Sequence, residues 1–287
     1  MFRSYLLLGC ILLLATGLPA HAAGKKAAAR PYVETSYLVA PRQVGEFELE
    51  DASFDPEQKY SGAGFRYARK DHQEIRFDVY VYPAGRMSQA DAVEAGVAAF
   101  REDLKHAVAA GSYTQLQELQ DYDFPLQTGA PRATPANDID AAVIKAQAEA
   151  GQITGRKLQL RMNLQPRDWP MYSSGYLFYK QLYFFKLRAS AAQERIPQAA
   201  FDALADRAAR ELIPAVQVTN IGDCANATIT LSADAAPEAS AVAMIQQLTV
   251  HQGHNCHASA NKAGLPSSDA DSERVQISYT ADEWKSQ

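Results

Sequence analysis

The stretch that most constrains the fold of this chain is residues 64–85, which read GFRYARKDHQEIRFDVYVYPAG and predict a β-hairpin. Apolar and polar side chains alternate along its second half. The apolar set is Ile75, Phe77, Val79 and Val81, and the set between them is Glu74, Arg76, Asp78, Tyr80 and Tyr82. Because successive side chains of a strand point to opposite faces, one face of this strand is apolar and the other is polar and aromatic. The apolar face needs a covering layer, and we expect the amphipathic segment 88–111 to supply it.

Helix signals follow each group of predicted strands. Ser88 and Asp91 make a capping-box-like pair at the start of the first helix. A second helix is expected over residues 134–151, where a proline opens the segment and a glycine ends it. We expect Ile139 and Val143 to face inward on this helix, because they recur at helical spacing among small alanines.

A second aromatic hairpin is expected over residues 176–190, after an alternating strand at 157–164 and before a third helix at 197–213. Strands that arrive as hairpins, with helices between the groups, are typical of a mainly antiparallel sheet covered by amphipathic helices, an α+β fold. At the level of fold alone, the order of elements over residues 32–220 resembles the Mog1/PsbP-like sandwich of some secreted and envelope proteins. This resemblance implies an architecture and no function.

A small C-terminal βαβ subdomain is expected over residues 221–287, packed against the main α+β domain at 32–220. Its predicted elements are strands at 228–232 and 274–280 and a helix at 237–250. A unit of this size is hardly stable alone, so a covalent link would help it. We expect Cys224 and Cys256 to form that disulfide, with a contribution of about 3–4 kcal/mol from restriction of the unfolded chain.

The N-terminal segment predicts export from the cytoplasm. Residues 1–22 combine a basic start, an apolar run and an A-x-A site, which is the pattern of a secretory signal peptide cleaved after Ala22. Residues 23–31 are expected to be a flexible tether. Cys10 sits in a Leu-Leu-Gly-Cys sequence that resembles a lipoprotein box, but the apolar run continues beyond it, so we assign it to the leader. The predicted location is the bacterial periplasm or the secreted fraction.

Charge and hydropathy argue against nucleic-acid binding and against a membrane span. The chain carries a formal net charge of −5 and lacks a long basic run, which argues against nucleic acid as the main partner. Beyond the leader, no apolar segment approaches the roughly 20 residues that a membrane-spanning helix needs. The mature chain is therefore expected not to span a membrane.

Three histidines lie close together in the sequence, at His251, His254 and His257. Neutral imidazole nitrogens bind zinc and copper, so this segment is a candidate metal site. The alternative is a solvated loop after a helix C-terminus, where the helix dipole also favours histidine. Because Cys256 is assigned to the disulfide, it is not available as a ligand, and no metal ligand or cofactor is assigned.

Aromatic and charged side chains mark two candidate recognition surfaces. The first is the polar face of the central strand, with Arg76, Asp78, Tyr80 and Tyr82. The second is the proline-rich loop that carries Trp169 and nearby Tyr172. Cross-strand pairing and core packing are the structural alternatives for these residues, and we favour them because nothing in the sequence marks a concave pocket.

The sequence shows neither a G-x-S-x-G nucleophile motif nor an H-E-x-x-H metalloprotease motif, and no catalytic residue is assigned. We therefore expect an exported, soluble envelope protein that binds a protein partner or a small ligand without catalysis. Two alternatives are metal binding by residues 251–257 and a hydrolase whose catalytic groups meet only in space.

Overall fold

A computed structural model describes residues 30–126, 134–265 and 270–284 of the chain. The strands are β1 (Thr35–Pro41), β2 (Gln43–Val44), β3 (Phe47–Phe54), β4 (Ala63–Arg69), β5 (Ile75–Pro83), β6 (Tyr113–Pro125), β7 (Thr154–Leu164), β8 (Trp169–Lys180), β9 (Tyr183–Ala192), β10 (Gln217–Ile221), β11 (Cys256–His257) and β12 (Ser272–Ser278). The helices are α1 (Gln89–Ala109), α2 (Asp138–Gly151), α3 (Gln198–Ala215) and α4 (Pro237–Gly253). The predicted signal peptide at 1–22 lies outside the described residues, as does most of the predicted tether.

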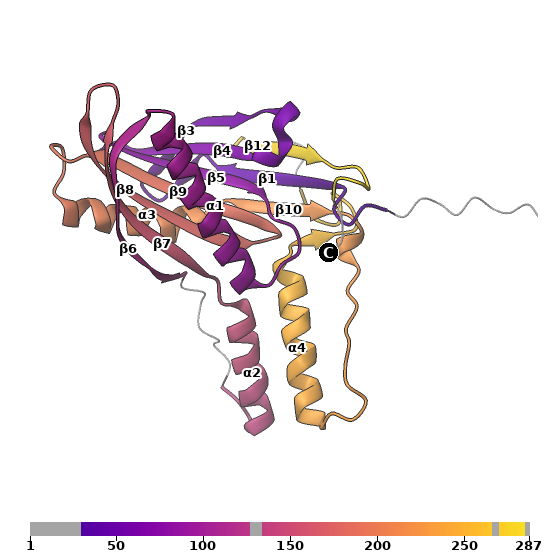
Figure 1. Cartoon of the computed structure of the whole chain (residues 1–287). Helices are drawn as coiled ribbons and strands as arrows, with labels where there is room; N and C mark the ends of the chain where they lie inside the picture. The colour runs from indigo at the N-terminus through magenta and orange to yellow at the C-terminus, as the bar shows by residue number, and fades with distance from the viewer. Residues whose placement is uncertain (1–29, 127–133, 266–269, 285–287) are drawn as a thin grey trace, which may run out of the picture.

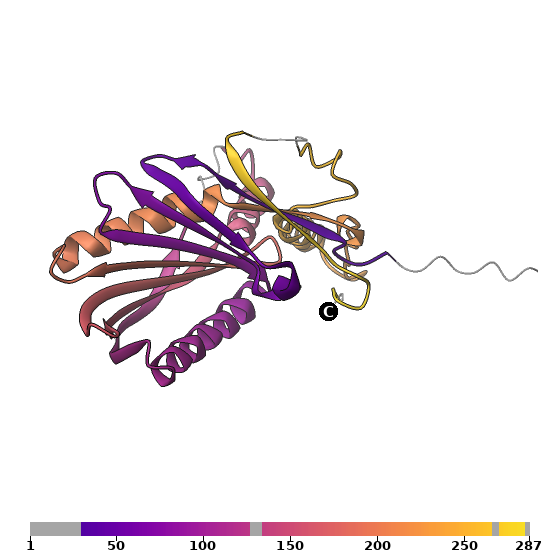
Figure 2. The same cartoon turned by 90° about the horizontal axis from the view of Figure 1, so that it is seen from above.

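The strands form two β-sheets, shown in Figure 1. The larger is antiparallel in the order β2-β3-β4-β5-β9-β8-β7-β6, and the smaller is mixed in the order β11-β10-β1-β12. Helices α1 and α3 lie on opposite faces of the larger sheet (Figure 2). The predicted α+β class, with a mainly antiparallel sheet covered by helices, is confirmed.

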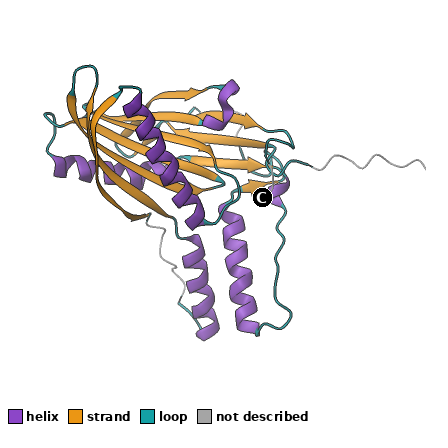
Figure 3. Cartoon of the chain, viewed as in Figure 1, coloured by secondary structure: helices purple, strands orange, loops and turns teal. Residues whose placement is uncertain are grey.

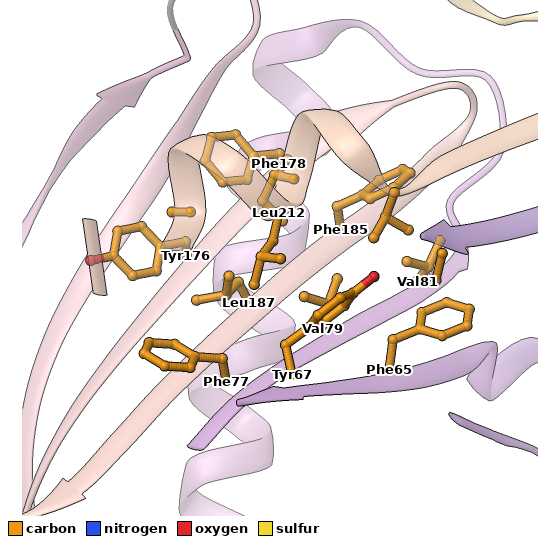
Figure 4. Close-up of a cluster of buried hydrophobic side chains, with 14 of the residues drawn as sticks. Phe65, Tyr67, Phe77, Val79, Val81, Tyr176, Phe178, Phe185, Leu187 and Leu212 are labelled. Atoms are coloured by element: carbon orange, nitrogen blue, oxygen red, sulfur yellow. The ribbon is translucent and has the colours of Figure 1, made fainter. Parts of the chain in front are cut away.

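The predicted central hairpin is formed by β4 and β5, and β5 lies in the middle of the larger sheet. The apolar side chains of β5 are buried, as the alternation predicts. Figure 4 shows the cluster around them, which includes Phe65, Tyr67, Phe77, Val79, Val81, Tyr176, Phe178, Phe185, Leu187 and Leu212. Each large side chain buried in this way contributes about 1.5–3 kcal/mol, so the cluster is a main source of the stability of the sheet.

The helix that covers the apolar face of β5 is α3, so the expectation that segment 88–111 covers it is wrong. Phe201 and Leu212 of α3 are buried in the same cluster as β5. Helix α1 does begin where predicted, and the Oγ of Ser88 accepts a hydrogen bond from the backbone N–H of Asp91 at 3.2 Å. It packs on the opposite face through a separate cluster made of Val97, Phe100, Leu104, Leu158, Leu160, Met162 and Leu177. On that face of the sheet β5 carries polar side chains, whereas β7 and β8 carry apolar ones. The apolar side chains of α1 therefore pack on β7 and β8.

Helices α2 and α4 pack against each other and project from the sheets (Figures 1 and 3). Both helices were predicted, and Asn137 caps α2 by accepting the amide of Asp140 at 2.9 Å. The prediction that Ile139 faces inward is wrong, because 45% of its surface is exposed. The main neighbour of α2 is α4, and of the α2 side chains only that of Ala146 is buried, so the predicted stripe is only partly covered.

Residues 228–232, which the structure describes, form no strand, so the βαβ unit is not formed by the expected strands. The parallel strands that α4 connects are β10 and β11. The amide of Thr230 donates to the side chain of Gln247 at 3.0 Å, and the carbonyl of Thr230 accepts from the same side chain at 2.8 Å. A helix side chain thus takes the place of a partner strand. The predicted closing strand forms as β12 and pairs with β1, while β11 pairs with β10. Residues on both sides of the predicted boundary at 220 therefore share one sheet.

Within the described ranges, no helix combines the length and the apolar character needed to cross a membrane.

Candidate ligand-binding site

An open cleft of about 650 Å³ lies on the polar face of β5. Its lining comes mainly from β4, β5, β7, β8 and β9, together with the start of β6. Arg66, Asp78 and Arg188 form one row across three strands, because Arg66 pairs with Asp78 and Asp78 pairs with Arg188. Arg76 and Ser190 form the next row on the same face. The register of the sheet therefore gathers these polar groups, which lie far apart in the sequence.

Helix α1 covers the sheet beside this row and sets one limit of the cleft. Gly175 is opposite Arg188 in the β8–β9 pair, and the ring of Phe100 fills the space above it. A Cβ atom at Gly175 would lie 2.1 Å from that ring. Helix and sheet therefore approach each other closely beside the cleft residue Arg188.

The two carboxylates that line the cleft are already paired. Asp78 accepts a hydrogen bond from Nε of Arg66 at 2.9 Å. Glu74 lies 2.9 Å from Nδ1 of His72, and this hydrogen bond lowers the pKa of Glu74. Both acids are therefore already hydrogen-bonded to side chains of the protein.

Two arginines of the cleft, Arg76 and Arg188, have no such compensation. Neither forms an ion pair with a carboxylate in the part of the chain that the structure describes. Arg188 is held by neutral groups instead: it donates to Tyr113 Oη at 2.8 Å and Ser173 Oγ at 3.3 Å, and it lies 5.0 Å from the centroid of the Tyr113 ring. Arg188 is therefore fixed in position while its charge is not neutralised.

One wall of the cleft is apolar and carries an exposed tryptophan. Met162, Met171 and Leu164 line this wall, and Trp169 lies beside them with 45% of its surface exposed. The guanidinium of Arg167 lies 4.8 Å from the centroid of the Trp169 ring.

The turn before Trp169 is fixed by Asp168. Its Oδ1 accepts from Thr114 at 3.1 Å, from Asn163 at 3.1 Å and from Gln165 at 2.8 Å. These hydrogen bonds lower the pKa of Asp168, so its carboxylate keeps its charge and holds the turn at neutral pH. The position of the tryptophan is thereby set by the fold of the β7–β8 turn.

Tyr80 stands at the border between the cleft and α1. Partial burial raises its pKa, Asp78 raises it further, and Arg188 acts in the opposite direction. Nζ of Lys186 lies 5.4 Å from its ring centroid. At neutral pH Tyr80 therefore presents a neutral hydroxyl to the cleft.

The structure brings together most, but not all, of the residues singled out in the sequence. Arg76, Asp78, Tyr80 and Trp169 line one cleft. Tyr82 lies outside that lining and packs on Phe184 with ring centroids 5.3 Å apart. Tyr172 points to the other face and stacks on Phe201 of α3 at 5.8 Å.

Sequence reasoning missed Arg188, Tyr113 and the methionines of the cleft. The available signal was the alternation of Lys186, Arg188 and Ser190 in β9, which matches the alternation of β5. It identifies a polar face of β9, but only the pairing of β9 with β5 shows that the polar faces of the two strands lie side by side in the sheet.

Cys224 and Cys256 are joined as a disulfide, with their Cα atoms 5.8 Å apart. Nearby, Nε2 of His251 lies 3.0 Å from the carbonyl oxygen of Cys224. Burial lowers the pKa of His254 to about 4, and the charges of His251 and Arg86 act in the same direction. His254 is therefore neutral at physiological pH.

The structure does not gather the three histidines into a ligand set. Nε2 of His257 lies 3.2 Å from Oδ1 of Asn255. Over the described ranges, no group of three or more His, Cys, Asp or Glu side chains is placed to hold a metal ion.

Neither the comparison with protein-family models nor the comparison with curated proteins gives a match for this chain.

Proposed function

We propose that this chain is a binding protein of the cell envelope, which captures a small ligand in the cleft on the polar face of β5. The observation that carries the proposal is the cleft itself: about 650 Å³, with apolar walls and a few fixed polar groups. Clefts of about 300–1,000 Å³ with this mixture of lining are the usual form of small-molecule sites. Trp169 and Tyr113 add the flat, rigid surfaces that ligand sites use.

The chemistry of the cleft supports binding in preference to acid–base catalysis. A general acid at neutral pH needs a raised carboxyl pKa, and Glu74 has a lowered one. Asp78 is hydrogen-bonded to Arg66 in the sheet. The polar groups of the cleft thus serve to orient a ligand.

The envelope location rests on the leader pattern at residues 1–22 and agrees with the Cys224–Cys256 disulfide, since disulfides persist in oxidising compartments. N-terminal sequencing of the native protein tests it. A start near Ala23 and recovery in the periplasmic or secreted fraction are expected, and recovery of Met1 beside cytosolic markers would contradict the location.

The binding proposal can be tested with the two tryptophans of the chain. Trp169 lines the cleft, and Trp284 is buried elsewhere, with 5% of its surface exposed. In protein labelled with 15N at tryptophan, each indole N–H gives one resonance, which a Trp284→Phe variant assigns. Screening of a fragment library should shift the Trp169 resonance and leave the Trp284 resonance in place.

A cleft-filling variant supplies the control. Ala192 lines the cleft, and Ala192→Phe should reduce the shifts of Trp169. If fragments shift Trp169 no more often than Trp284, or if Ala192→Phe leaves the shifts unchanged, the cleft is not a ligand site.

A further inference from the structure

We infer that the ligand of the cleft is an organic anion with an apolar or aromatic part, whose acidic group binds between Arg76 and Arg188. This inference rests on the proposed function and names the chemical class of its ligand. It follows from three features of the cleft: the balance of charge, the spacing of the two arginines, and the position of the apolar wall.

The charge of the lining is positive after its internal pairs are counted. Four arginines line the cleft, namely Arg66, Arg76, Arg188 and Arg195, against Glu74 and Asp78. Arg66 is paired with Asp78, and Arg195 lies 3.5 Å from Glu194 outside the lining. Among the residues described, Arg76 and Arg188 are left without a carboxylate. An anionic ligand would supply the missing charge, whereas a cation would be repelled.

The register of the sheet sets the two arginines at a spacing that suits one acidic group. Arg76 is opposite Ser190, and Arg188 is opposite Asp78, so Arg76 and Arg188 are diagonal neighbours on one face. Such neighbours lie about 7–8 Å apart at the backbone, within reach of long side chains. Two guanidinium groups can therefore meet on a single carboxylate, sulfonate or phosphate, with Ser190 between them as a further hydroxyl.

Arg188 is already oriented for this role. A guanidinium has five N–H donors, and Arg188 uses three of them, on Tyr113, on Ser173 and, at 3.6 Å, on the sulfur of Met162. These contacts occupy one donor each, so donors remain for a ligand. Because the side chain is held before binding, little conformational entropy is lost when an anion arrives, and the affinity gains accordingly.

The apolar wall determines the rest of the ligand. Trp169, Met162 and Met171 lie beside the arginines in the same cleft. Methionine sulfur and an indole ring provide adaptable contacts for an aromatic or aliphatic group. A bare inorganic anion would leave this wall in contact with water, so the cleft fits a ligand that combines both parts.

Two matched fluorescent probes test the inference. 8-Anilinonaphthalene-1-sulfonate and N-phenyl-1-naphthylamine share one aromatic core, and only the first carries an acidic group. Binding is followed by energy transfer from Trp169 in the Trp284→Phe background, and the part of the signal that the cleft-filling Ala192→Phe variant removes reports this cleft. The anionic probe should bind at least about tenfold more tightly than the uncharged one, the gain expected from charge-assisted hydrogen bonds.

Arginine variants then identify the groups that bind the anion. Arg76→Gln, Arg188→Gln and the double variant should each weaken the anionic probe, by about tenfold or more in the double variant, and leave the uncharged probe within twofold. Arg76 is exposed, so its variant should fold normally even if Arg188→Gln does not. Arg42→Gln is the matched control, because Arg42 is exposed, pairs with Glu273 and lies outside the cleft.

The outcomes separate the two proposals. If both probes bind near Trp169 with equal affinity, or if the arginine variants leave the anionic probe unaffected, the ligand class is wrong and the cleft remains a small-molecule site. If neither probe transfers energy from Trp169 and the fragment screen also leaves its resonance unchanged, the proposed function itself fails.

Discussion

Lys180 ends β8 with its ammonium group buried in the core. Nζ donates to the carbonyl of Val216 at 2.7 Å and lies 4.3 Å from the centroid of the Phe185 ring. In the described part of the chain it forms no ion pair with a carboxylate. Burial therefore lowers the pKa of Lys180 to about 7, from 10.5 in water.

This shift predicts that stability rises with pH. Between pH 7 and 10.5 the unfolded chain binds the Lys180 proton and the folded chain has lost it, so the free energy of unfolding increases by up to about 1.4 kcal/mol per pH unit. Below pH 7 Lys180 is protonated in both states and the full cost of its burial remains. Urea unfolding at pH 7 and pH 9 should show the rise in the natural chain and lose most of it in Lys180→Met. Lys70→Met is the control, because Lys70 is 86% exposed, and it should keep the natural slope.

At this scale, the sequence indicates which residues share a face but not which faces meet. Arg76, Asp78 and Tyr80 follow from alternation within one strand. Arg188 of β9 is paired with Asp78 of β5, and these two strands belong to different hairpins of the chain. Pairing between distant strands depends on packing of the whole sheet, so the cleft could not be predicted from either strand alone.

The position of helix α1 on the sheet depends on the absence of a side chain at Gly175. A Cβ atom at this residue would lie 2.1 Å from the ring of Phe100 of α1. Gly175→Ala should push the helix away from β8 and destabilise the protein by about 1–3 kcal/mol, the usual cost of overpacking. Gly253→Ala in α4 is the control, since the added carbon meets no atom within 4 Å outside its own stretch of helix. This variant should be as stable as the natural chain or up to about 1 kcal/mol more stable, because alanine favours a helix over glycine. Equal unfolding of the two variants would show that α1 adapts without cost.

The Cys224–Cys256 bond connects the short 3-10 helix Asp223–Ala225, which follows β10, to β11, across a separation of 32 residues that includes α4. A loop of this length corresponds to about 3–4 kcal/mol of stabilisation in the chain-entropy model. Cys224→Ser with Cys256→Ser should lower the free energy of unfolding by that order, and a reducing agent should lower it in the natural chain and not in the variant. Two free thiols in denatured, unreduced protein would contradict the bond.

The positions of the strands and helices were predicted more successfully than the pairing of the strands and the packing of the helices. Alternation and capping residues predicted the central hairpin, the second hairpin and the start of α1 at Ser88. The same patterns failed at residues 228–232, where alternating side chains lacked a strand edge to pair with and Gln247 satisfied the backbone instead. They also assigned α1 to the wrong face, because an apolar stripe does not specify which apolar surface it meets.

At the scale of the molecule, the C-terminal residues complete the core. Tyr279 Oη lies 2.7 Å from Tyr183 Oη, and Trp284 stacks on Tyr183 with ring centroids 5.9 Å apart. Trp284→Ala should cost about 3–5 kcal/mol, the range for removing a buried tryptophan. Trp284→Phe keeps most of the stacking and removes an indole N–H that has no acceptor among the described residues, so it should cost clearly less. Chemical unfolding of both variants measures the difference, and equal losses would show that ring stacking here is unimportant.

The α+β class could be predicted from the chain, since it follows from local periodicity. The second sheet could not, because β1 pairs with β10 and β12, which come from residues 217–221 and 272–278. No local pattern reports a contact over that separation, so the sequence alone does not indicate that residues on both sides of position 220 share one sheet.

The place of β1 between two late strands also bears on how the protein reaches its final state. During synthesis β1 emerges before β10 and β12, so the backbone groups on its second edge stay unpaired until residue 278 has arrived. Closure of long-range pairs of this kind is slow. Until then a newly made chain carries an open strand edge, and such edges can pair with other chains and lead to aggregation.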